Sequence, residues 1–269
     1  MSRPAGRSLA SSLGRSLGRF LLLLVVCFLA LQLAFVVRVA WMLVVNPEST
    51  TFQRSEAWRL SLAPRPLAWQ QRWVDYGAIS ANVKRAVIAS EDAGFGEHSG
   101  IEWDALEKAW ERNQRAEAVA ERSNERAAAE AARRSREAAE TKPGRVARVI
   151  GGSTITQQLA KNLFLAGERS FVRKGQELVL AYVMEGVLGK QRILEIYLNN
   201  VEWGEGVFGV DAAARRYFRS GAGALGTQQA AQLAVMLPAP KRFEKRPASG
   251  YVLGRAATIA ARMGAVDIP

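Results

Sequence analysis

Residues 151–162, GGSTITQQLAKN, place hydrogen-bonding side chains in a way that suits ligand binding. On a helical wheel, Thr154, Gln158, Lys161 and Asn162 share one face, and apolar side chains occupy the opposite face. A solvated helix face usually carries Glu and Lys, whereas this face offers amides and a hydroxyl with little charge. We interpret it as a surface for an oxygen-rich ligand; an ordinary amphipathic helix is the alternative.

Two adjacent acids, Glu91 and Asp92, follow a short helix that is predicted over residues 81–90 with Ser80 as its N-terminal cap. At a helix C-terminus these carboxylates repel each other and meet the negative end of the helix dipole. Both effects raise the proton affinity of a carboxylate toward that of a general base. Glu91 is therefore a candidate base, although acids in surface loops are also common.

A third group of charges consists of Arg173, Lys174 and Glu177, which lie within one helical turn. Its simplest interpretation is an exposed intrahelical ion pair. Together with Lys161, however, the two cations have the right chemistry to flank a pyrophosphate, because lysine supplies point charge and arginine supplies forked hydrogen bonds. These residues predict an anion site near the polar helix face.

The elements that must hold these side chains are almost all helical. Beyond residue 170, apolar residues recur every three to four positions, and strand alternation is scarce. The predicted helices are 171–187, 190–198, 210–218, 227–237 and 251–263. We therefore expect residues 79–269 to form one mainly α-helical domain.

The N-terminal segment predicts a membrane anchor over residues 20–45. Residues 20–37 carry no charge, and a helix of that length covers roughly 27 Å. No small-x-small cleavage site follows the run, so we favour an uncleaved span over a signal peptide. The tail of residues 1–19 contains arginine and no acid, which predicts a cytoplasmic N-terminus, a single pass and an extracytoplasmic domain.

The net charge of +12 points to anionic partners. Basic residues beside a membrane meet anionic headgroups, and the same excess can serve the phosphates of a ligand. Nucleic acid is not an expected partner, because an anchored extracytoplasmic domain has little access to it and the sequence lacks interleaved basic and aromatic residues. Cys27, the only cysteine, lies in the middle of the span and supports no redox inference.

Two further segments interrupt the helical pattern. Residues 46–78 contain three prolines and three tryptophans, which predict an irregular interfacial segment. Residues 111–142 consist almost entirely of Ala, Glu and Arg and cannot enter a core, so we expect either an exposed helix or a charged loop. Pairs such as Glu111 with Arg115 would support the helix by roughly 0.3 kcal/mol each.

Four motifs in a fixed order identify a family. They are EDAGFGEHSG from Glu91, GGSTITQQLAKNLF from Gly151, RKGQE from Arg173 and RILEIYLNNVEWGEGVFG from Arg192. Over about residues 79–265 the chain closely resembles the peptidoglycan glycosyltransferase family in its monofunctional, membrane-anchored form. The resemblance implies a lysozyme-like helical domain that polymerises lipid II into β-1,4 glycan strands on the outer face of the bacterial inner membrane. It also implies inversion and release of undecaprenyl pyrophosphate.

The resemblance assigns roles to individual residues. Glu91 matches the family's catalytic base, which deprotonates the 4-hydroxyl of the acceptor N-acetylglucosamine, and Glu177 matches the second essential acid. The matches expected around the substrate are Asp92, Phe95 and His98 in the loop after the base, Thr154, Gln158 and Asn162 on the polar helix, and Lys161, Arg173 and Lys174 at the pyrophosphate. For His98, the only histidine, we expect a structural role in holding that loop.

Elementary chemistry agrees with these roles. Glycosidases need a general acid to protonate a departing sugar alcohol, whereas pyrophosphate leaves as a stabilised anion and needs positive charge instead. We therefore expect Glu177 to orient the cations or a bound metal rather than to donate a proton. The sequence requires no cofactor; the resemblance allows Mg or Mn at the pyrophosphate, but the sequence shows no independent ligand cluster for it.

Two other functions are compatible with parts of this pattern. A lytic transglycosylase or lysozyme-like hydrolase also uses a glutamate in a helical domain, but it needs no three cations around a leaving phosphate. A non-enzymatic, membrane-anchored scaffold would reach out through residues 111–142, which look like an insertion between the first two motifs. The expected partners of the enzyme are lipid II, the growing glycan strand, the bilayer and division or elongation proteins. SxxK and KTG are absent, so we expect no penicillin-sensitive transpeptidase domain.

Overall fold

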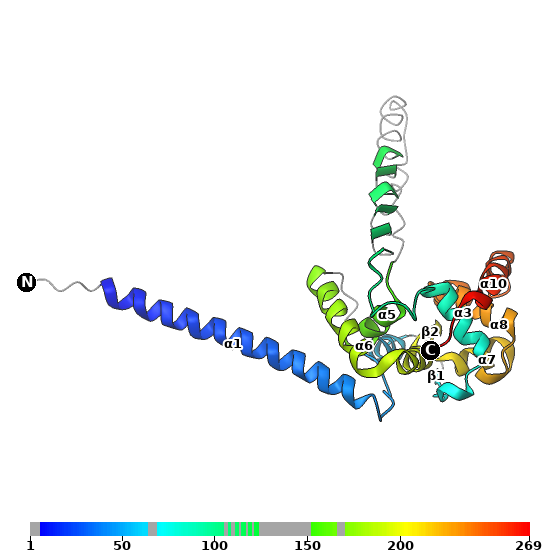
Figure 1. Cartoon of the computed structure of the whole chain (residues 1–269), viewed down its shortest axis with the longest axis horizontal. Helices are drawn as coiled ribbons and strands as arrows, with labels where there is room; N and C mark the ends of the chain where they lie inside the picture. The colour runs from blue at the N-terminus through cyan, green and yellow to red at the C-terminus, as the bar shows by residue number, and fades with distance from the viewer. Residues whose placement is uncertain are drawn as a thin grey trace, which may run out of the picture. The chain divides into compact units, whose positions relative to one another are not determined.

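The structure is a computed structural model whose helices dominate the chain (Figure 1). It describes residues 6–63, 69–104, 107–108, 111–112, 114–116, 118–119, 121–123, 152–165 and 170–269. The chain forms two compact units, Met1–Glu48 and Ser49–Pro269. The predicted combination of an N-terminal helix and a mainly helical domain is confirmed.

The first unit is built on one long helix, α1 (Gly6–Trp41). Within it, Ser16–Trp41 is long and apolar enough to cross a membrane, with a mean hydropathy of 3.0. Large apolar side chains such as Leu23 are exposed along this stretch, which costs free energy in water and not in lipid. Residues 42–45, at the end of the predicted anchor, form a turn after the helix has ended.

Part of the interfacial segment is more regular than its sequence suggested. Thr51–Ser61 form helix α2, because Thr50 and Gln53 make a capping box. The Thr50 hydroxyl accepts a hydrogen bond from the Gln53 N–H at 3.0 Å, and the Gln53 side chain accepts one from the Thr50 N–H at 2.8 Å. The prediction of an irregular segment was therefore wrong for these residues, and the Thr-x-x-Gln spacing was the signal for a helix.

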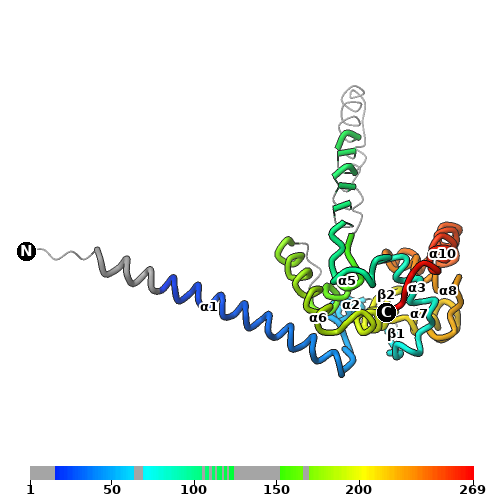
Figure 2. The backbone as a smooth tube through the Cα atoms, in the orientation of Figure 1, coloured from blue at the N-terminus to red at the C-terminus, as the bar shows by residue number. Residues whose placement is uncertain are grey.

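Three helices carry most of the residues singled out above. They are α3 (Ala81–Glu91), α5 (Ile155–Phe164) and α6 (Phe171–Asn200). Ser80 caps α3 as predicted, since its hydroxyl accepts from the Asn82 N–H. Helix α5 packs along α6, as the adjacent tubes in Figure 2 show. Helix α6 is kinked at Gly189, whose φ of +72° suits glycine, so the predicted break between residues 187 and 190 is confirmed.

The rest of the second unit consists of a small sheet and a helical group. Its elements are β1 (Gln70–Gln71), η1 (Tyr76–Ala78), β2 (Glu202–Gly204), β3 (Val207–Phe208), α7 (Val210–Phe218), η2 (Ala222–Ala224), α8 (Thr227–Met236), α9 (Pro240–Phe243), α10 (Gly250–Arg262) and η3 (Met263–Ala265). The sheet order is β1-β3-β2, with β1 parallel and β2 antiparallel to β3, and Gln70 lies opposite Val207. Helix α3 packs against α8 and α10 (Figure 1), so two later helices hold the helix that ends at Glu91.

The predicted helices of this group agree closely with the observed ones. Helix α7 has the predicted bounds, α8 ends one residue earlier than predicted, and α10 both begins and ends one residue earlier than predicted. Large side chains from distant parts of the chain fill the core, and Trp203, Tyr197, Phe95 and Phe208 are fully buried. Each such burial contributes about 2 kcal/mol relative to exposure.

The first part of the charged segment is helical wherever it is described. Positions 111–112, 114–116, 118–119 and 121–123 have helical backbone, which favours the exposed helix over the charged loop. The predicted Glu111–Arg115 ion pair is formed at 3.0 Å between exposed side chains. The remainder of the predicted segment, residues 124–142, lies outside the described residues.

Candidate active site

Glu91 is the last residue of α3 and lies half-buried next to α5. The Gln158 side chain donates a hydrogen bond from Nε2 to Glu91 Oε2 at 3.0 Å. The pKa of Glu91 is raised, mainly because burial disfavours the charged carboxylate and also because the charge of Asp92 is adjacent, while the Gln158 hydrogen bond acts in the opposite direction. A raised pKa increases the affinity of this carboxylate for a proton, which suits a general base.

The amide of Gln158 is oriented by Tyr197 on α6. The Tyr197 hydroxyl donates to Gln158 Oε1 at 3.0 Å, which leaves Nε2 to face Glu91. Tyr197 is buried, and its pKa is raised well above the ordinary value by burial and by the charges of Glu91 and Asp92. The phenol therefore stays a hydrogen-bond donor, and this chain of contacts fixes the orientation of the Glu91 carboxylate.

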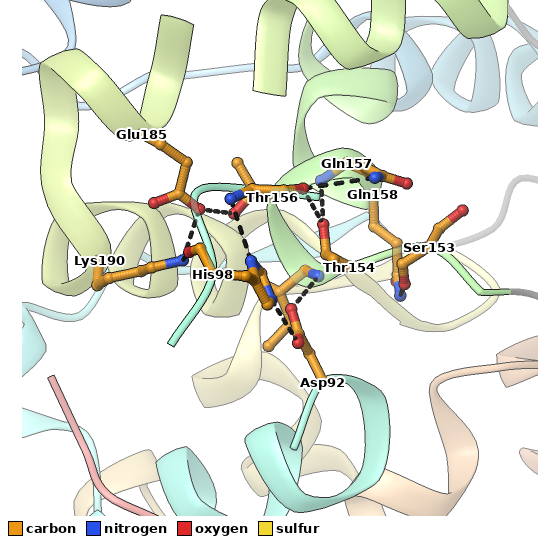
Figure 3. A network of polar contacts seen from close by, with 11 residues as sticks. Asp92, His98, Ser153, Thr154, Thr156, Gln157, Gln158, Glu185 and Lys190 are labelled. Carbon is orange, nitrogen blue, oxygen red and sulfur yellow. Dashed lines mark hydrogen bonds and ion pairs between the residues drawn. The ribbon is translucent and has the colours of Figure 1, made fainter. Parts of the chain in front are cut away.

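Asp92 is buried, and both of its carboxylate oxygens are bound by protein groups. Oδ1 accepts from His98 Nε2 at 2.8 Å, and Oδ2 accepts from the N–H of Ile155, the first residue of α5, at 2.9 Å (Figure 3). The Gly100 N–H donates to His98 Nδ1 at 3.0 Å, so Nδ1 carries no hydrogen and the neutral imidazole donates from Nε2. Asp92 therefore ties the loop after Glu91 to the N-terminus of α5, where the helix dipole favours negative charge.

Thr154 is the N-cap of α5 rather than a member of its polar face. Its hydroxyl accepts from the Gln157 N–H at 3.2 Å and donates to the Gly100 carbonyl at 2.7 Å, and the residue is 2% exposed. The predicted place of Thr154 on the polar helix face was therefore wrong, because a threonine directly before the first apolar residue of a helix is a typical N-cap. The polar face of the helix begins at Gln158.

Three residues expected around the substrate thus lie in the interior. Phe95 is fully buried, and its ring meets the His98 imidazole edge-on with the centroids 6.4 Å apart. Asp92 and Thr154 are buried with their side chains bound by other protein groups. Their positions suit them for holding Glu91 and α5 in place rather than for contacting a substrate.

The cations expected at a pyrophosphate gather near the start of α6. Arg173 Nη1 donates to Glu177 Oε2 at 2.9 Å, and Lys174 Nζ makes a short hydrogen bond to Oε1 of the same carboxylate. The Glu177 side chain is 3% exposed, whereas those of Arg173 and Lys174 are 20% and 33% exposed. A buried carboxylate therefore holds two partly exposed cations in place, and both of its oxygens are occupied.

Lys174 also joins this cluster to the start of α5. Its Nζ donates to Ser153 Oγ and to Gln157 Oε1, each at 3.2 Å. The Ser153 carbonyl in turn accepts from Gln158 Nε2 at 3.4 Å, and this is the nitrogen that contacts Glu91. One short chain of contacts therefore leads from the candidate base to the cations.

Lys161 lies on the exposed side of α5 within electrostatic reach of the same cluster. The pKa of Lys161 is lowered, mainly because the surrounding groups exclude water from its ammonium group. The charge of Glu177 raises this pKa, and the charges of Arg173 and Lys174 lower it. Cations that repel one another are stabilised by a bound polyanion. The cluster therefore has the charge for a diphosphate. Asn162, the neighbour of Lys161, is half-buried on the same helix.

Exposed apolar side chains accompany these cations on α6. Phe171 and Val172 are 92% and 85% exposed, and Val179 and Tyr182 follow at spacings that keep them on the same side of the helix. Exposed apolar residues beside cations are typical of a surface that meets lipid or another apolar partner.

One group in the described part of the chain has spacing compatible with a metal ion. Ligand atoms of Asp92, His98 and Glu102 lie within 4.8 Å of one another. His98 Nε2 carries the hydrogen that Asp92 accepts, however, and the second Asp92 oxygen is bound by the Ile155 N–H. Because neither side chain has a free ligand atom in this arrangement, the group does not fit a metal site.

Several residues that organise the site were not predicted from the sequence. They are Ser153, Gln157, Glu185, Lys190 and Tyr197. Ser153 and Gln157 belong to the motif GGSTITQQLAKN, so the motif itself was their signal. Tyr197 lies in the motif RILEIYLNNVEWGEGVFG, which was likewise its signal. Glu185 and Lys190 lie outside the four motifs, and their contacts join segments that are far apart in the chain.

The sequence of the chain was compared with those of known proteins and protein families, and it matches one family. The Transglycosylase family matches residues 63–122 and 130–264. A biosynthetic peptidoglycan transglycosylase of Burkholderia thailandensis is 49% identical over 242 residues, which cover 90% of this chain and 83% of that protein. Its counterparts in Burkholderia multivorans and Burkholderia ambifaria are each 48% identical over 242 residues, covering 90% of this chain and 87% of their own length. The chain belongs to the Transglycosylase family, as its four motifs indicated.

Proposed function

We propose that this chain polymerises lipid II into β-1,4 glycan strands, with Glu91 as the general base and the cations around Glu177 as the site of the leaving pyrophosphate. Membership of the family makes it a glycosyltransferase of peptidoglycan synthesis. One observation carries the assignment of roles, namely the different surroundings of two glutamates. Glu91 faces a neutral amide and has a raised pKa, whereas Glu177 is bound by Arg173 and Lys174.

The first step of the proposed reaction is proton removal by Glu91. The 4-hydroxyl of the acceptor N-acetylglucosamine donates its proton to the carboxylate, whose orientation is fixed by Gln158 and Tyr197. The hydroxyl oxygen then forms a bond to the anomeric carbon of the donor as the bond from that carbon to the pyrophosphate breaks. Attack from the face opposite the leaving group converts the α-linked pyrophosphate into a β-1,4 linkage.

The second requirement is stabilisation of the departing diphosphate. Lys161, Arg173 and Lys174 supply positive charge where negative charge grows in the transition state. Glu177 keeps two of these cations in place, and because both of its oxygens are occupied it is poorly placed to donate a proton. Pyrophosphate leaves as an anion, so no proton donor is required.

We further propose that α1 spans the bacterial inner membrane with residues 1–19 in the cytoplasm and the second unit outside. The tail contains arginine without acid, and the helix is apolar enough to span. Both substrates carry polyprenyl tails, so an anchor confines their encounter with the enzyme to two dimensions. The exposed residues Phe171 and Val172 lie beside the cations, and we expect them to meet the bilayer where the polyprenyl chain leaves the site.

The proposal is tested with the purified full-length protein and lipid II, with glycan length read on a gel and polyprenyl pyrophosphate quantified. The wild type should release polyprenyl pyrophosphate and form long strands. Glu91→Gln keeps the shape of the side chain and removes the base, so kcat should fall about 1,000-fold. Glu205→Gln is the matched control, because Glu205 pairs with Arg59 away from this site and its loss should leave the rate unchanged.

The hydrolase alternative predicts a different result. A lysozyme-like enzyme would degrade finished peptidoglycan and would keep that activity in Lys161→Met, since it has no phosphate to stabilise. The polymerase would not degrade peptidoglycan and would lose glycan synthesis in this variant. A wild type that cleaves strands and releases no polyprenyl pyrophosphate would contradict the proposed function.

A further inference from the structure

We infer that Glu185 and Lys190, which lie on either side of the kink in α6, are positioning residues for the general base. The inference rests on the proposed function of Glu91. Neither residue touches Glu91; they act through the loop that follows it and through the start of α5.

The two residues form a largely buried ion pair. Lys190 Nζ lies 2.8 Å from Glu185 Oε1, and the two side chains are 19% and 7% exposed. Lys190 also donates to the backbone carbonyl of His98 and lies 4.5 Å from the centre of the Phe95 ring. The lysine therefore contacts the loop at two points, the backbone carbonyl of His98 and the Phe95 ring, and Figure 3 shows the first of them.

The glutamate of the pair holds the start of α5. Glu185 Oε1 accepts a hydrogen bond from the Thr156 hydroxyl, in the first turn of that helix. The loop backbone also lies close to Glu185, since a Cβ added to Gly100, whose φ is +85°, would come within 2.9 Å of Glu185 Cγ. One ion pair thus joins three segments: α6, the loop after Glu91 and the N-terminus of α5.

The kink at Gly189 is what allows the pair to form. In an uninterrupted helix, residues five positions apart point roughly 140° apart around the axis and do not meet. The positive φ of Gly189 changes the direction of the chain before Lys190 and brings its ammonium group back to Glu185. The kink therefore has a specific consequence at the site.

Both sides of the Glu91–Gln158 contact are attached to this pair. On one side, Lys190 donates a hydrogen bond to the carbonyl of His98, and the His98 imidazole donates to Asp92, the residue next to Glu91. On the other side, Glu185 holds Thr156 on the helix that carries Gln158. Displacement of a catalytic group by about 1 Å lowers rates by up to ~100-fold, so a small shift here is enough to matter. Within the described part of the chain, the pair contacts Thr156, His98 and Phe95 and not Lys161, Arg173 or Lys174, so binding of the diphosphate should change little.

The experiment compares three variants of the full-length protein. Lys190→Met removes the charge and keeps much of the length, and Lys190→Arg restores the charge. The Arg side chain has room, because Lys190 and Glu185 line a cavity of about 370 Å³. Arg192→Met is the matched control, since it breaks another largely buried ion pair of α6, with Glu195 at 2.7 Å.

Steady-state polymerisation and melting temperature are measured for each protein. Lys190→Met should lower kcat about tenfold or more and leave the KM for lipid II within about twofold, while Lys190→Arg recovers most of the rate. Arg192→Met should lose stability without this loss of kcat. The inference is overturned if Lys190→Met and Arg192→Met lose kcat equally at matched stability, if Lys190→Arg is no better than Lys190→Met, or if only KM changes.

A second measurement separates this inference from the proposed function. Amide hydrogen exchange should increase in Lys190→Met over residues 92–99 and 152–160, relative to a peptide from α10, and should stay at the wild-type level there in Arg192→Met. If the wild type makes no glycan, the proposed function fails, while the exchange result still decides whether the pair holds these segments. Should Lys190→Met not fold, Glu185→Gln provides the same comparison, with a smaller expected loss of kcat.

Discussion

The end of α3 and the first turns of α6 each carry a glutamate, Glu91 and Glu177, and the surroundings of these two side chains differ. Glu91 is half-buried and accepts a hydrogen bond from the neutral amide of Gln158. Glu177 is buried and has one cation on each oxygen. Side-chain type therefore does not decide the role of an acid. Its partners do, because an amide leaves the carboxylate able to take a proton, whereas two ion pairs keep it as a fixed counter-ion.

After the loss already expected for Glu91→Gln, the next largest effect that tests this comparison is expected at Glu177. Glu177→Gln removes the counter-ion that holds Arg173 and Lys174, so kcat should fall about 100-fold, in line with the loss of electrostatic stabilisation of a leaving group. The pH at which activity rises should not change, since Glu91 remains the titrating base. The measurement is the pH–rate profile of lipid II polymerisation.

A matched control for this variant exists elsewhere in the second unit. Glu56 also accepts from an arginine and a lysine, Arg59 and Lys241. Glu56→Gln should therefore lower stability with little effect on kcat. Equal loss of activity in both variants would mean that Glu177 acts only on stability, and a displaced pH profile in Glu177→Gln would mean that Glu177 titrates during the reaction.

An intermediate effect is expected at Gln158. Its hydrogen bond favours the ionised form of Glu91, so Gln158→Met, which keeps the volume and excludes water, should raise the pKa of Glu91 further. The base is then protonated up to a higher pH, and the rising limb of kcat/KM should move to higher pH together with about a tenfold loss of rate. Gln228→Met, on the exposed side of α8, is the control and should keep the wild-type profile. If the rising limb of kcat/KM moved to lower pH instead, Glu91 would not be the general base.

The smallest effect on activity is expected at a third glutamate, Glu202. Burial raises its pKa to about 7, Lys241 opposes this at 3.4 Å, and the charge of Glu56 adds to it. The unfolded chain ionises this group from about pH 4.5 upward, whereas the folded protein keeps it protonated until about pH 7. The contribution of Glu202 to stability is therefore present below pH 4.5 and is lost as pH rises through 7, by up to about 3 kcal/mol.

Glu202→Gln should abolish this pH dependence and leave kcat unchanged. The measurement is the melting temperature between pH 4.5 and 8, in which the wild type should lose stability over the interval and the variant should lose less. Parallel curves for the two proteins would show that Glu202 ionises normally in the folded state.

Much of the helical architecture was predictable because apolar periodicity is a local property. The bounds of α7 follow from its three-to-four spacing alone, and Ser80 was recognisable as the cap of α3. Local signals failed at Thr51–Ser61, because tryptophan and nearby proline indicate an irregular segment while the capping box of Thr50 and Gln53 indicates a helix. Secondary structure is hardest to predict where two local signals within one segment, here a capping box and Trp/Pro content, favour different structures.

The amino-acid sequence was enough to predict the family, the apolar helix, the order of the helices and the set of charged and amide side chains from which the site is built. These follow from motif order and from periodicity, which each segment carries within itself. The three-dimensional arrangement was needed to learn that Asp92 and Thr154 are buried, that Tyr197 orients Gln158 and that Lys190 reaches Glu185 across a kink. The physical reason is that burial, hydrogen-bond partners and pKa depend on which distant segments come together, and a helical wheel shows which side chains share a face without showing what lies opposite them.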